Sequence, residues 1–327
     1  MTDLVTGGTG FVGAAVVRAL LEEGRGVRAL ARPGSDRRNL QGLDVEIVEG
    51  DLRDAASLKQ AVAGADQVFH VAADYRLWVR RPADLYEANV TGSQALIRAA
   101  AEAGANRIVY TSSVAVLATA RPGAPANEDT PVSVDNMIGH YKRSKFLAEQ
   151  AVMAEVSAGA PVVIVNPSTP VGPRDIKPTP TGRLIRDAAA GKLPAYVDTG
   201  LNVVHVDDVA AGHLLAARHG TTGRRYILGG ENLSLRDILA LIAEAARRDP
   251  PKVRLPRRPL FPLAWASEAW ARMTRTDTEP LLTVDGLKMA GKLMWFSSAR
   301  AEAELGYTHR PAGDAIQDAV NWFVTSA

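Results

Sequence analysis

The first half of the chain alternates short apolar runs with longer segments in which apolar residues recur at helical spacing. The apolar runs predict strands at residues 3–5, 27–31, 45–48, 67–71, 108–111 and 162–165. The longer segments predict helices over residues 14–21, 54–63 and 84–103, and from about Tyr141 onward. Strands and helices that alternate with short connections are typical of an α/β fold with a doubly wound parallel sheet.

The alternation breaks after Pro167, where four prolines between residues 170 and 180 interrupt regular elements. Beyond them the pattern predicts strands at 203–206 and 225–228, a helix between them that Asp207 and Asp208 cap, and several further helices. We therefore predict a larger domain over residues 1–167, with contributions from about 201–218, and a smaller mixed α/β lobe over residues 168–327.

The turn after the first predicted strand is rich in glycine and reads TGGTGFVG over residues 6–13. Gly7 permits a tight turn, Gly10 lets the backbone approach a pyrophosphate, and Gly13 lets the next helix pack on the strand. The N-terminus of that helix offers N–H groups and a partial positive charge to phosphates. Turns without a ligand also collect glycines, but the strand and helix on either side favour a Rossmann dinucleotide site. Its predicted contacts are Gly7, Thr9, Gly10, Phe11, Val12 and Gly13.

The tip of the second predicted strand bears on which dinucleotide binds. An acidic residue there would accept hydrogen bonds from the adenosine ribose 2′-OH, whereas an arginine accommodates a 2′-phosphate. The chain has Arg32 at this tip, with Ser35, Arg37 and Arg38 close behind it. NADP(H) is therefore favoured over NAD(H), which stays open; the alternative interpretation is a solvated basic loop, because arginine is common throughout the chain.

Further cofactor contacts are expected at the carboxyl ends of the other strands, where ligands bind in open parallel sheets. Asp51 follows the third strand and would hydrogen-bond the adenine amine or cap the next helix. The remaining expected contacts, which include small residues that leave room for ribose and nicotinamide, are Leu52, Ala72, Ala73, Pro167 and Thr169. His70 lies inside the fourth strand and is interpreted as a core residue.

Composition narrows the classes of function. The chain has 327 residues, a formal net charge of +2 and no cysteine, which excludes disulfides, thiolate catalysis and cysteine-held metals. No metal site is predicted, and scattered arginines without interleaved aromatics make nucleic-acid binding unexpected. No secretion signal precedes the first strand and no apolar run reaches membrane-spanning length, so we expect a cytoplasmic protein without stable membrane insertion.

One apolar segment, residues 260–273, contains two tryptophans and follows Arg254, Arg257 and Arg258. Such a segment can lie on a membrane surface. We favour the commoner alternative, a helix that is buried or faces the substrate.

Tyr141 and Lys145 are four residues apart and share one face of a helix. A phenol titrates at about 10, but a nearby ammonium and a positive nicotinamide ring favour the phenolate and bring its pKa toward the operating pH. Lys145 would also bond the nicotinamide ribose, and Ser113, at the end of the fifth strand, would hold a substrate oxygen. Together these residues fit hydride transfer between a nicotinamide and a C–O carbon, with Tyr141 as the proton donor.

These motifs resemble the extended short-chain dehydrogenase/reductase superfamily over nearly the whole chain. The resemblance is carried by TGGTGFVG, Ser113, and YKRSK at residues 141–145. It implies that Asn89, in the motif Asn-Val-Thr-Gly, supports the active site, and the segment HVDDVA at 205–210 resembles a further motif of the group. Longer segments are similar to bacterial hopanoid-associated sugar epimerases and plant dihydroflavonol 4-reductases: HVAADYRLW, GHYKRSKFLAEQ, VNPSTPVGPRDIKPTPTGR and YILGGENL.

The resemblance implies an NAD(P)-dependent oxidoreductase acting on a hydroxyl or ketone of a small molecule, in hopanoid or related metabolism. The alternative is a sugar-nucleotide epimerase or dehydratase, but such enzymes generally place an acidic residue where this chain has Arg32. A non-catalytic dinucleotide sensor is a third hypothesis, which the intact Ser, Tyr and Lys set disfavours. Relatives often form homodimers through helices equivalent to 84–103 and 141–155. Expected substrate contacts are Asp74, Tyr75, Trp78, Ser168 and Arg174.

Overall fold

The computed structural model describes residues 1–79, 81–119, 124–274, 280 and 282–325. Seven parallel strands form the main sheet in the order β10-β6-β5-β4-β1-β2-β3. Their bounds are β1 Thr2–Thr6, β2 Gly26–Ala31, β3 Glu46–Glu49, β4 Gln67–His70, β5 Arg107–Thr111, β6 Val162–Pro167 and β10 Arg225–Leu228. The doubly wound Rossmann sheet predicted from the sequence is confirmed.

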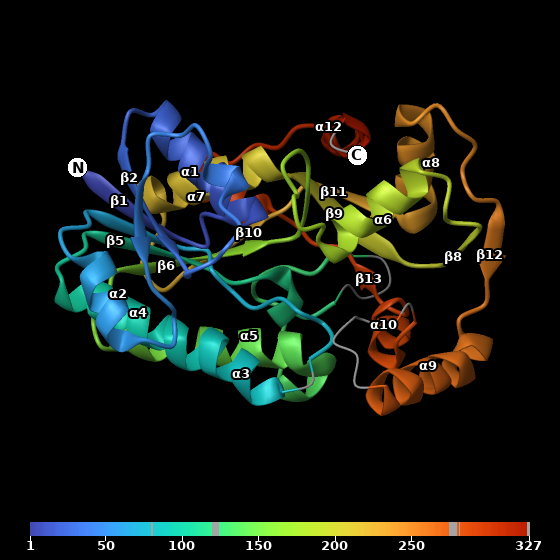
Figure 1. Ribbon diagram of the computed structural model, residues 1–327, viewed down its shortest axis with the longest axis horizontal. Helices are drawn as coiled ribbons and strands as arrows, with labels where there is room; N and C mark the ends of the chain where they lie inside the picture. The colour runs from blue at the N-terminus through green and yellow to red at the C-terminus, as the bar shows by residue number, and fades with distance from the viewer. Residues whose placement is uncertain (80, 120–123, 275–279, 281, 326–327) are drawn as a thin grey trace.

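Helices cover both faces of this sheet (Figure 1). One face carries α1 Phe11–Glu22, α7 Val206–His219 and α11 Ala299–Leu305, and the other carries α2 Ala55–Val62, α4 Ser93–Glu102 and α5 Gly139–Ser157. Because both faces are covered, the central strands β4, β5 and β6 are almost wholly buried, which explains their continuous apolar runs.

A smaller lobe lies beside the sheet. It contains the strands β7 Thr169–Val171, β9 Gly200–His205, β11 Glu231–Ser234 and β13 Leu293–Met294, and the pair β8 Ala195–Val197 and β12 Val253–Leu255. Its core packs these strands against α6 Pro180–Ala189, α8 Leu235–Ala245 and α12 Ala312–Thr325. Two further helices, α9 Phe261–Met273 and α10 Val284–Met289, pack against each other at the rim. The mixed α/β lobe of the prediction is therefore present.

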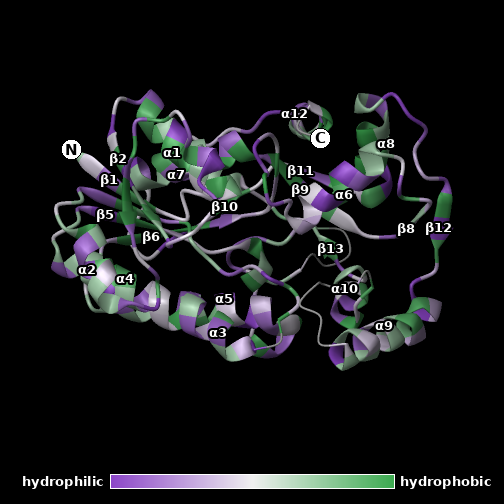
Figure 2. Cartoon of the chain, in the orientation of Figure 1, coloured by the Kyte–Doolittle hydropathy of each residue, from purple (hydrophilic) through white to green (hydrophobic). Residues whose placement is uncertain are grey.

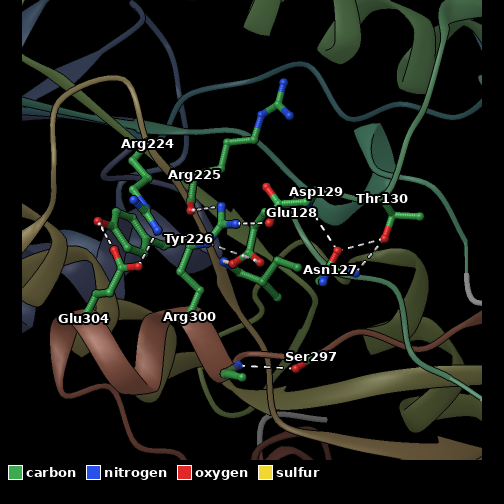
Figure 3. A network of polar contacts seen from close by, with 12 residues as sticks. Asn127, Glu128, Asp129, Thr130, Arg224, Arg225, Tyr226, Ser297, Arg300 and Glu304 are labelled. Carbon is green, nitrogen blue, oxygen red and sulfur yellow. Dashed lines mark hydrogen bonds and ion pairs between the residues drawn. The ribbon is translucent and has the colours of Figure 1, made fainter.

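The boundary that we drew from the sequence left residues 225–228 in the smaller lobe, whereas the structure pairs them with β6 as β10. A network of polar contacts holds this edge strand (Figure 3). The buried Glu128 carboxylate accepts the Ile227 N–H at 2.9 Å, and Glu304 of α11 accepts the Tyr226 hydroxyl at 3.0 Å. Asp129 pairs with Arg300 of α11. The edge strand β10, helix α11 and the loop that contains Glu128 and Asp129 are thus joined to the large domain.

Two helix caps differ from the sequence prediction. Asp54 rather than Asp51 caps α2, because its side chain accepts the Ala56 N–H. At α7 the N-cap is His205, whose Nδ1 accepts the Asp207 N–H at 3.0 Å. Each prediction chose the first carboxylates at the helix start, but the residue that takes the extended N-cap conformation decides which side chain reaches the free amides.

The predicted long helix at 84–103 is interrupted. It consists of α3 Pro82–Tyr86, a π-helical segment Glu87–Gly92, and α4. Gly92 closes the segment where a Cβ atom would lie 2.8 Å from both Cβ and the carbonyl oxygen of Leu52. The glycine therefore lets this helix approach the loop after β3.

Candidate active site

The glycine turn lies where the strand order reverses, between β1 and β4. Gly7 has φ +72°, and a Cβ atom there would lie 2.8 Å from the Ala72 nitrogen after β4. A Cβ atom on Gly13 would lie 2.1 Å from the Gly7 carbonyl oxygen. Only glycine fits at these two positions, and ligands of doubly wound sheets bind at this switch point.

Helix α1 begins at the turn without a side-chain cap, so its first N–H groups point toward the switch point. Gly10 is the N-cap residue, and Phe11, Val12 and Gly13 form the first turn of the helix. Uncapped amides at a helix N-terminus suit a pyrophosphate. The turn therefore fits the dinucleotide predicted from the sequence.

Unpartnered polar atoms give an independent test of that fit. Within the described residues, six buried side-chain atoms have no hydrogen-bond partner: Arg18 Nε, Ser35 Oγ, Trp78 Nε1, Ser112 Oγ, Asn166 Oδ1 and Ser168 Oγ. Five of these residues follow or end strands β2, β4, β5 and β6, and Arg18 lies on α1. Buried polar atoms without partners are costly. Their concentration at the carboxyl edge of the sheet indicates a polar ligand there.

The arginines near the tip of β2 differ in their partners. Arg37 donates to Glu49 at 2.5 Å, and Arg38 pairs with Asp36 at 2.7 Å. The exposed Arg32 side chain makes no hydrogen bond or ion pair with any residue that the structure describes, and Ser35 Oγ lies close by in the chain. Arg32 is therefore the guanidinium left available for an adenosine 2′-phosphate.

The other predicted cofactor contacts lie along the same edge. Ala72 follows β4 and donates its N–H to Thr6 Oγ1 at 3.1 Å, with Ala73 next to it. Pro167 ends β6 and Thr169 begins β7. Asp51 and Leu52 follow β3, and hydrogen bonds from Arg53 lower the pKa of the Asp51 carboxyl to about 2. The structure thus brings the residues predicted for the cofactor to one edge.

Tyr141 lies in the first turn of α5, beside Ser113. Burial raises the pKa of the Tyr141 phenol, and the nearby Ser113 side chain partly opposes this increase. Ser113 Oγ also accepts the Ala115 N–H at 3.1 Å, while Asn166 donates to its carbonyl oxygen at 3.1 Å. Ser113 and Tyr141 therefore come together as predicted.

Lys145 differs from the prediction. Its Nζ donates to the Thr111 carbonyl oxygen at 2.8 Å and to Tyr110 Oη at 3.2 Å, and lies 4.8 Å from the centre of the Tyr110 ring. Burial lowers the pKa of Lys145 to about 8. The expectation that this ammonium lowers the pKa of Tyr141 is therefore wrong for this structure, because desolvation dominates both groups and Lys145 bonds to β5.

A chain of buried polar groups continues from Tyr110. Ser93 is close enough to Tyr110 to influence the pKa of its phenol, and His70 Nε2 lies 2.8 Å from Ser93 Oγ. On the other side of the ring, His70 Nδ1 lies 2.8 Å from Thr6 Oγ1 at the end of β1. Burial lowers the pKa of His70 to about 3, so the ring is neutral at pH 7. His70 is the core residue that the sequence predicted.

Asn89 lies in the π-helical segment and holds two parts of the site. Its Oδ1 accepts the Asp74 N–H at 2.7 Å, and its Nδ2 donates to the Asp74 carbonyl oxygen at 2.9 Å and to Ser144 Oγ at 3.0 Å. The amide therefore fixes the loop after β4 against α5, one turn from Tyr141.

A cavity of about 740 Å³ opens next to Tyr141. Its wall comes from the loop after β4, the start of α5, α9 and α10, and includes Leu77, Trp78, Val79, Ile138, His140, Trp265, Arg272 and Met289. Arg272 lies 5.8 Å from the Trp78 ring centre. Of the predicted substrate contacts, Trp78 lines this cavity.

The other predicted substrate contacts lie outside the cavity wall. Asp74 pairs with Arg76 at 2.5 Å, and Tyr75 is partly exposed. Ser168 is at the sheet edge, and Arg174 pairs with Asp207 at 2.6 Å. Arg174 is also close enough to Arg18 of α1 to lower its pKa, after burial as the larger cause. These contacts place Arg174 on the α1 side of the sheet edge rather than in the cavity.

Sequence reasoning missed several residues of the site. No sequence motif marks Tyr110 or Ser93. A tyrosine in a buried strand and a serine in a helix are typical of ordinary core positions. Arg272 and Met289 approach Tyr141 from more than a hundred residues away. The one usable signal was Glu149, four residues after Lys145 and therefore on the same helix face; it is buried and accepts from Asn166 at 3.3 Å.

The sequence model of the NAD dependent epimerase/dehydratase family matches residues 4–229. The chain belongs to this family. A "Putative dihydroflavonol 4-reductase" from Synechocystis sp. is 46% identical over 98% of this chain and 93% of that protein. "Sterol demethylase protein B" from Methylococcus capsulatus is 36% identical over 99% and 98%. The crystal structure of gox2253 superposes with a TM-score of 0.89 at 52% identity, covering 100% of this chain and 98% of the other.

Further relatives of this chain are named as reductases or dehydrogenases. One is a ketoreductase from Stigmatella aurantiaca, 32% identical over 98% of this chain and 96% of that protein, whose named substrate is a 3-oxo-4-farnesyl-dihydroquinoline oxide. The family and these relatives support an oxidoreductase that uses a nicotinamide dinucleotide. None of the described helices is both long enough and apolar enough to cross a membrane.

Proposed function

We propose that this protein is an NADP(H)-dependent reductase for a carbonyl, or CH–OH, carbon of a large and mostly apolar molecule. The observation that carries the proposal is the position of Tyr141. Its side chain lies close to Ser113 at the sheet edge and also lines the 740 Å³ cavity. One tyrosine therefore connects the expected cofactor edge with the space for a substrate.

Ser113 and Tyr141 would have different roles in the hydride transfer. Ser113 Oγ accepts the Ala115 N–H, and its O–H would turn from the Tyr141 phenol to donate to a substrate carbonyl oxygen. The bound nicotinamide would supply the hydride. As the carbonyl oxygen gains negative charge, Tyr141 would donate its proton to that oxygen.

Lys145 supports this transfer from within α5. Its pKa of about 8 is close to physiological pH, so the ammonium can lose and regain a proton there. Its bonds to Thr111 and Tyr110 hold it against β5, where it would contact the nicotinamide ribose of a bound cofactor. Asn89 would hold the loop that contains Asp74 in its position relative to α5.

The substrate class follows from the cavity. Its wall combines tryptophan and aliphatic side chains with a few polar groups, as sites for apolar ligands do. The relatives named above for dihydroflavonol, sterol and farnesyl-bearing compounds point to ring-containing or isoprenoid substrates. We propose hopanoid or related terpenoid metabolism as the setting of the reaction, and the sterol and farnesyl compounds in the names of two relatives support this proposal.

NADP(H) is proposed over NAD(H) because Arg32 is available for a 2′-phosphate while Arg37 and Arg38 are paired. A fluorescence titration with NADPH and NADH, together with extraction of any cofactor retained through purification, tests this. We expect reversible NADPH binding with at least tenfold preference, lost in Arg32→Ala and kept in Arg38→Ala.

The alternative function, a sugar-nucleotide epimerase, predicts the opposite behaviour of the cofactor. An epimerase returns its hydride within one turnover and has no need to release its cofactor, whereas a reductase exchanges cofactor each time. Tightly retained NAD without preference for the 2′-phosphate, with interconversion of a nucleotide sugar such as UDP-glucose, would replace the reductase proposal. Consumption of NADPH with a steroid ketone or a dihydroflavonol would support it.

A further inference from the structure

Helix α9 turns an apolar face to solvent. The exposed fractions of Leu263, Trp270 and Met273 are 61%, 65% and 71%. On a helical projection these residues and the exposed Pro262, Ala266 and Ala269 occupy one side, and Arg272 borders it. This finding corrects the expectation that the segment is buried, although Trp265 does line the cavity.

The opposite side of α9 is fixed to the protein. Ala264 and Ala271 are buried, and α9 packs against α10. Glu268 accepts the Val284 N–H at 2.7 Å and pairs with Arg272 at 3.4 Å. The helix is therefore held in place with its apolar face outward. It lies at the rim of the molecule (Figure 1), and much of its ribbon carries the hydrophobic colour in Figure 2.

Positive charge surrounds this face. Residues 252–274 contain five basic residues and one acidic residue, and the acidic one is the inward-facing Glu268. The side chains of Arg254 and Arg272 are 67% and 72% exposed although each has a carboxylate partner, Asp198 at 3.4 Å for Arg254 and Glu268 for Arg272. Arg258 is also exposed. Val253 and Leu255 of β12, which precede α9 in the chain, are further exposed apolar side chains.

We propose that α9 and β12 dock this protein on the surface of an anionic lipid bilayer, with α9 lying in the plane of the interface. An apolar helix face that carries tryptophans and is bordered by arginines is the pattern of interfacial helices. Basic side chains next to it gain free energy from anionic headgroups. A helix of 13 residues is too short to span the hydrocarbon core.

A second copy of the chain fits this surface less well. In a two-fold contact the same face meets itself, so exposed arginines of one copy, such as Arg258 and Arg272, would lie near those of the other. Like charges opposed across an interface disfavour association. An anionic surface neutralises the same charges instead.

Docking would also orient the cavity. Trp265, Ala271 and Arg272 of α9 line its wall while neighbouring residues of the same helix face outward. An apolar ligand could then move from the bilayer along α9 to Tyr141. The docking itself is independent of the reductase proposal, because it needs only the outer face of α9.

Vesicle flotation tests the docking without any substrate. The protein as purified is mixed with neutral phosphatidylcholine vesicles and with mixed phosphatidylcholine–phosphatidylglycerol vesicles. We expect at least tenfold tighter binding to the mixed vesicles, weakened by added salt because the attraction is screened. The double substitution Trp270→Ser with Met273→Ser should weaken that binding at least tenfold.

Matched variants separate docking from folding. Val324→Ser removes an equally exposed apolar side chain on α12, far from α9 in Figure 1, and should leave vesicle binding unchanged. All variants should retain NADPH affinity and melting temperature, since the altered side chains are exposed. Equal binding to both vesicle types, no binding, or unchanged binding by the double variant would overturn the proposal. A loss of dimer mass in the double variant by sedimentation velocity would assign the face to a second copy.

Discussion

At the scale of the residue, the properties of Tyr141 depend on burial more than on its neighbour in the sequence. The spacing of Tyr141 and Lys145 predicts a shared helix face, and both side chains do lie on the inner side of α5. The hydrogen bonds of Lys145, however, go to Thr111 and Tyr110 on β5. The pKa of the phenol is consequently raised by burial, and its activity must depend on Ser113 and on the bound cofactor.

Removal of the Tyr141 hydroxyl should therefore separate catalysis from binding. We expect Tyr141→Phe to lower kcat at least a hundredfold, as loss of a positioned proton donor typically does. Its NADPH dissociation constant should stay within about threefold of the wild-type value, because the ring remains in place. Tyr196→Phe, a matched change at a half-buried tyrosine of β8 in the smaller lobe, should leave kcat nearly unchanged. Equal losses in both variants would remove Tyr141 from the proposed role.

The buried Lys145 should also make stability depend on pH in a defined direction. Its pKa is about 8 in the folded protein and 10.5 in the unfolded chain, so the unfolded state binds more protons between these values and stability rises with pH. The free energy of unfolding of the wild type, relative to Lys145→Met, should therefore be lowest below pH 8. It should increase by about 3 kcal/mol toward pH 10.5. Urea denaturation of both proteins across this range measures the difference, and a constant difference would contradict the assigned environment.

At the scale of the element, backbone geometry prepares the cofactor edge. The turn after β1 brings the Gly7 carbonyl oxygen so close to Gly13 that no side chain fits there. The π-helical segment changes the direction of Asn89 so that one amide reaches both the Asp74 backbone and Ser144. Such segments often occur at functional sites, and no residue pattern in 84–103 predicted this one.

Gly13→Ala should displace the start of α1, since its Cβ would lie 2.1 Å from the Gly7 oxygen. We expect at least a tenfold loss of NADPH affinity and a lower free energy of unfolding, measured by fluorescence titration and urea denaturation. Gly313→Ala on α12 is the matched control, because its Cβ would meet only Leu241 at 4.0 Å. Its stability should be unchanged or slightly higher. Similar behaviour of the two variants would refute the close-packing account of the turn.

At the scale of the whole molecule, the candidate active site is built where the two lobes meet. The large domain contributes the cofactor edge and Tyr141, and the rim helices α9 and α10 contribute the outer wall of the cavity. The polar network around Glu128 and Arg300 ties the later part of the chain back to the sheet. This return explains why β10 belongs to the first domain despite its position in the sequence.

Association of two copies is expected through α4 and α5 rather than through α9. Leu147 of α5 is apolar and 39% exposed, and the family resemblance implies pairing through these helices. Sedimentation velocity should give twice the chain mass of 34.8 kDa for the wild type and the single-chain mass for Leu147→Glu, because a charge would be buried at the contact. Val324→Glu should remain a dimer. A monomeric wild type, or a dimeric Leu147→Glu, would reject this interface.

The sequence by itself determined the features that depend on neighbouring residues. Strand and helix periods, the glycine turn, and the four-residue spacing of Tyr141 and Lys145 all follow from local backbone geometry, which a few adjacent residues specify. Only the tertiary structure decided that Lys145 bonds to β5 and that Arg32 makes no hydrogen bond or ion pair with the described residues. It also decided how α9 closes the cavity and which face of α9 is exposed. Those properties arise where segments distant in the chain meet, and burial and hydrogen bonding there depend on residues that no local pattern contains.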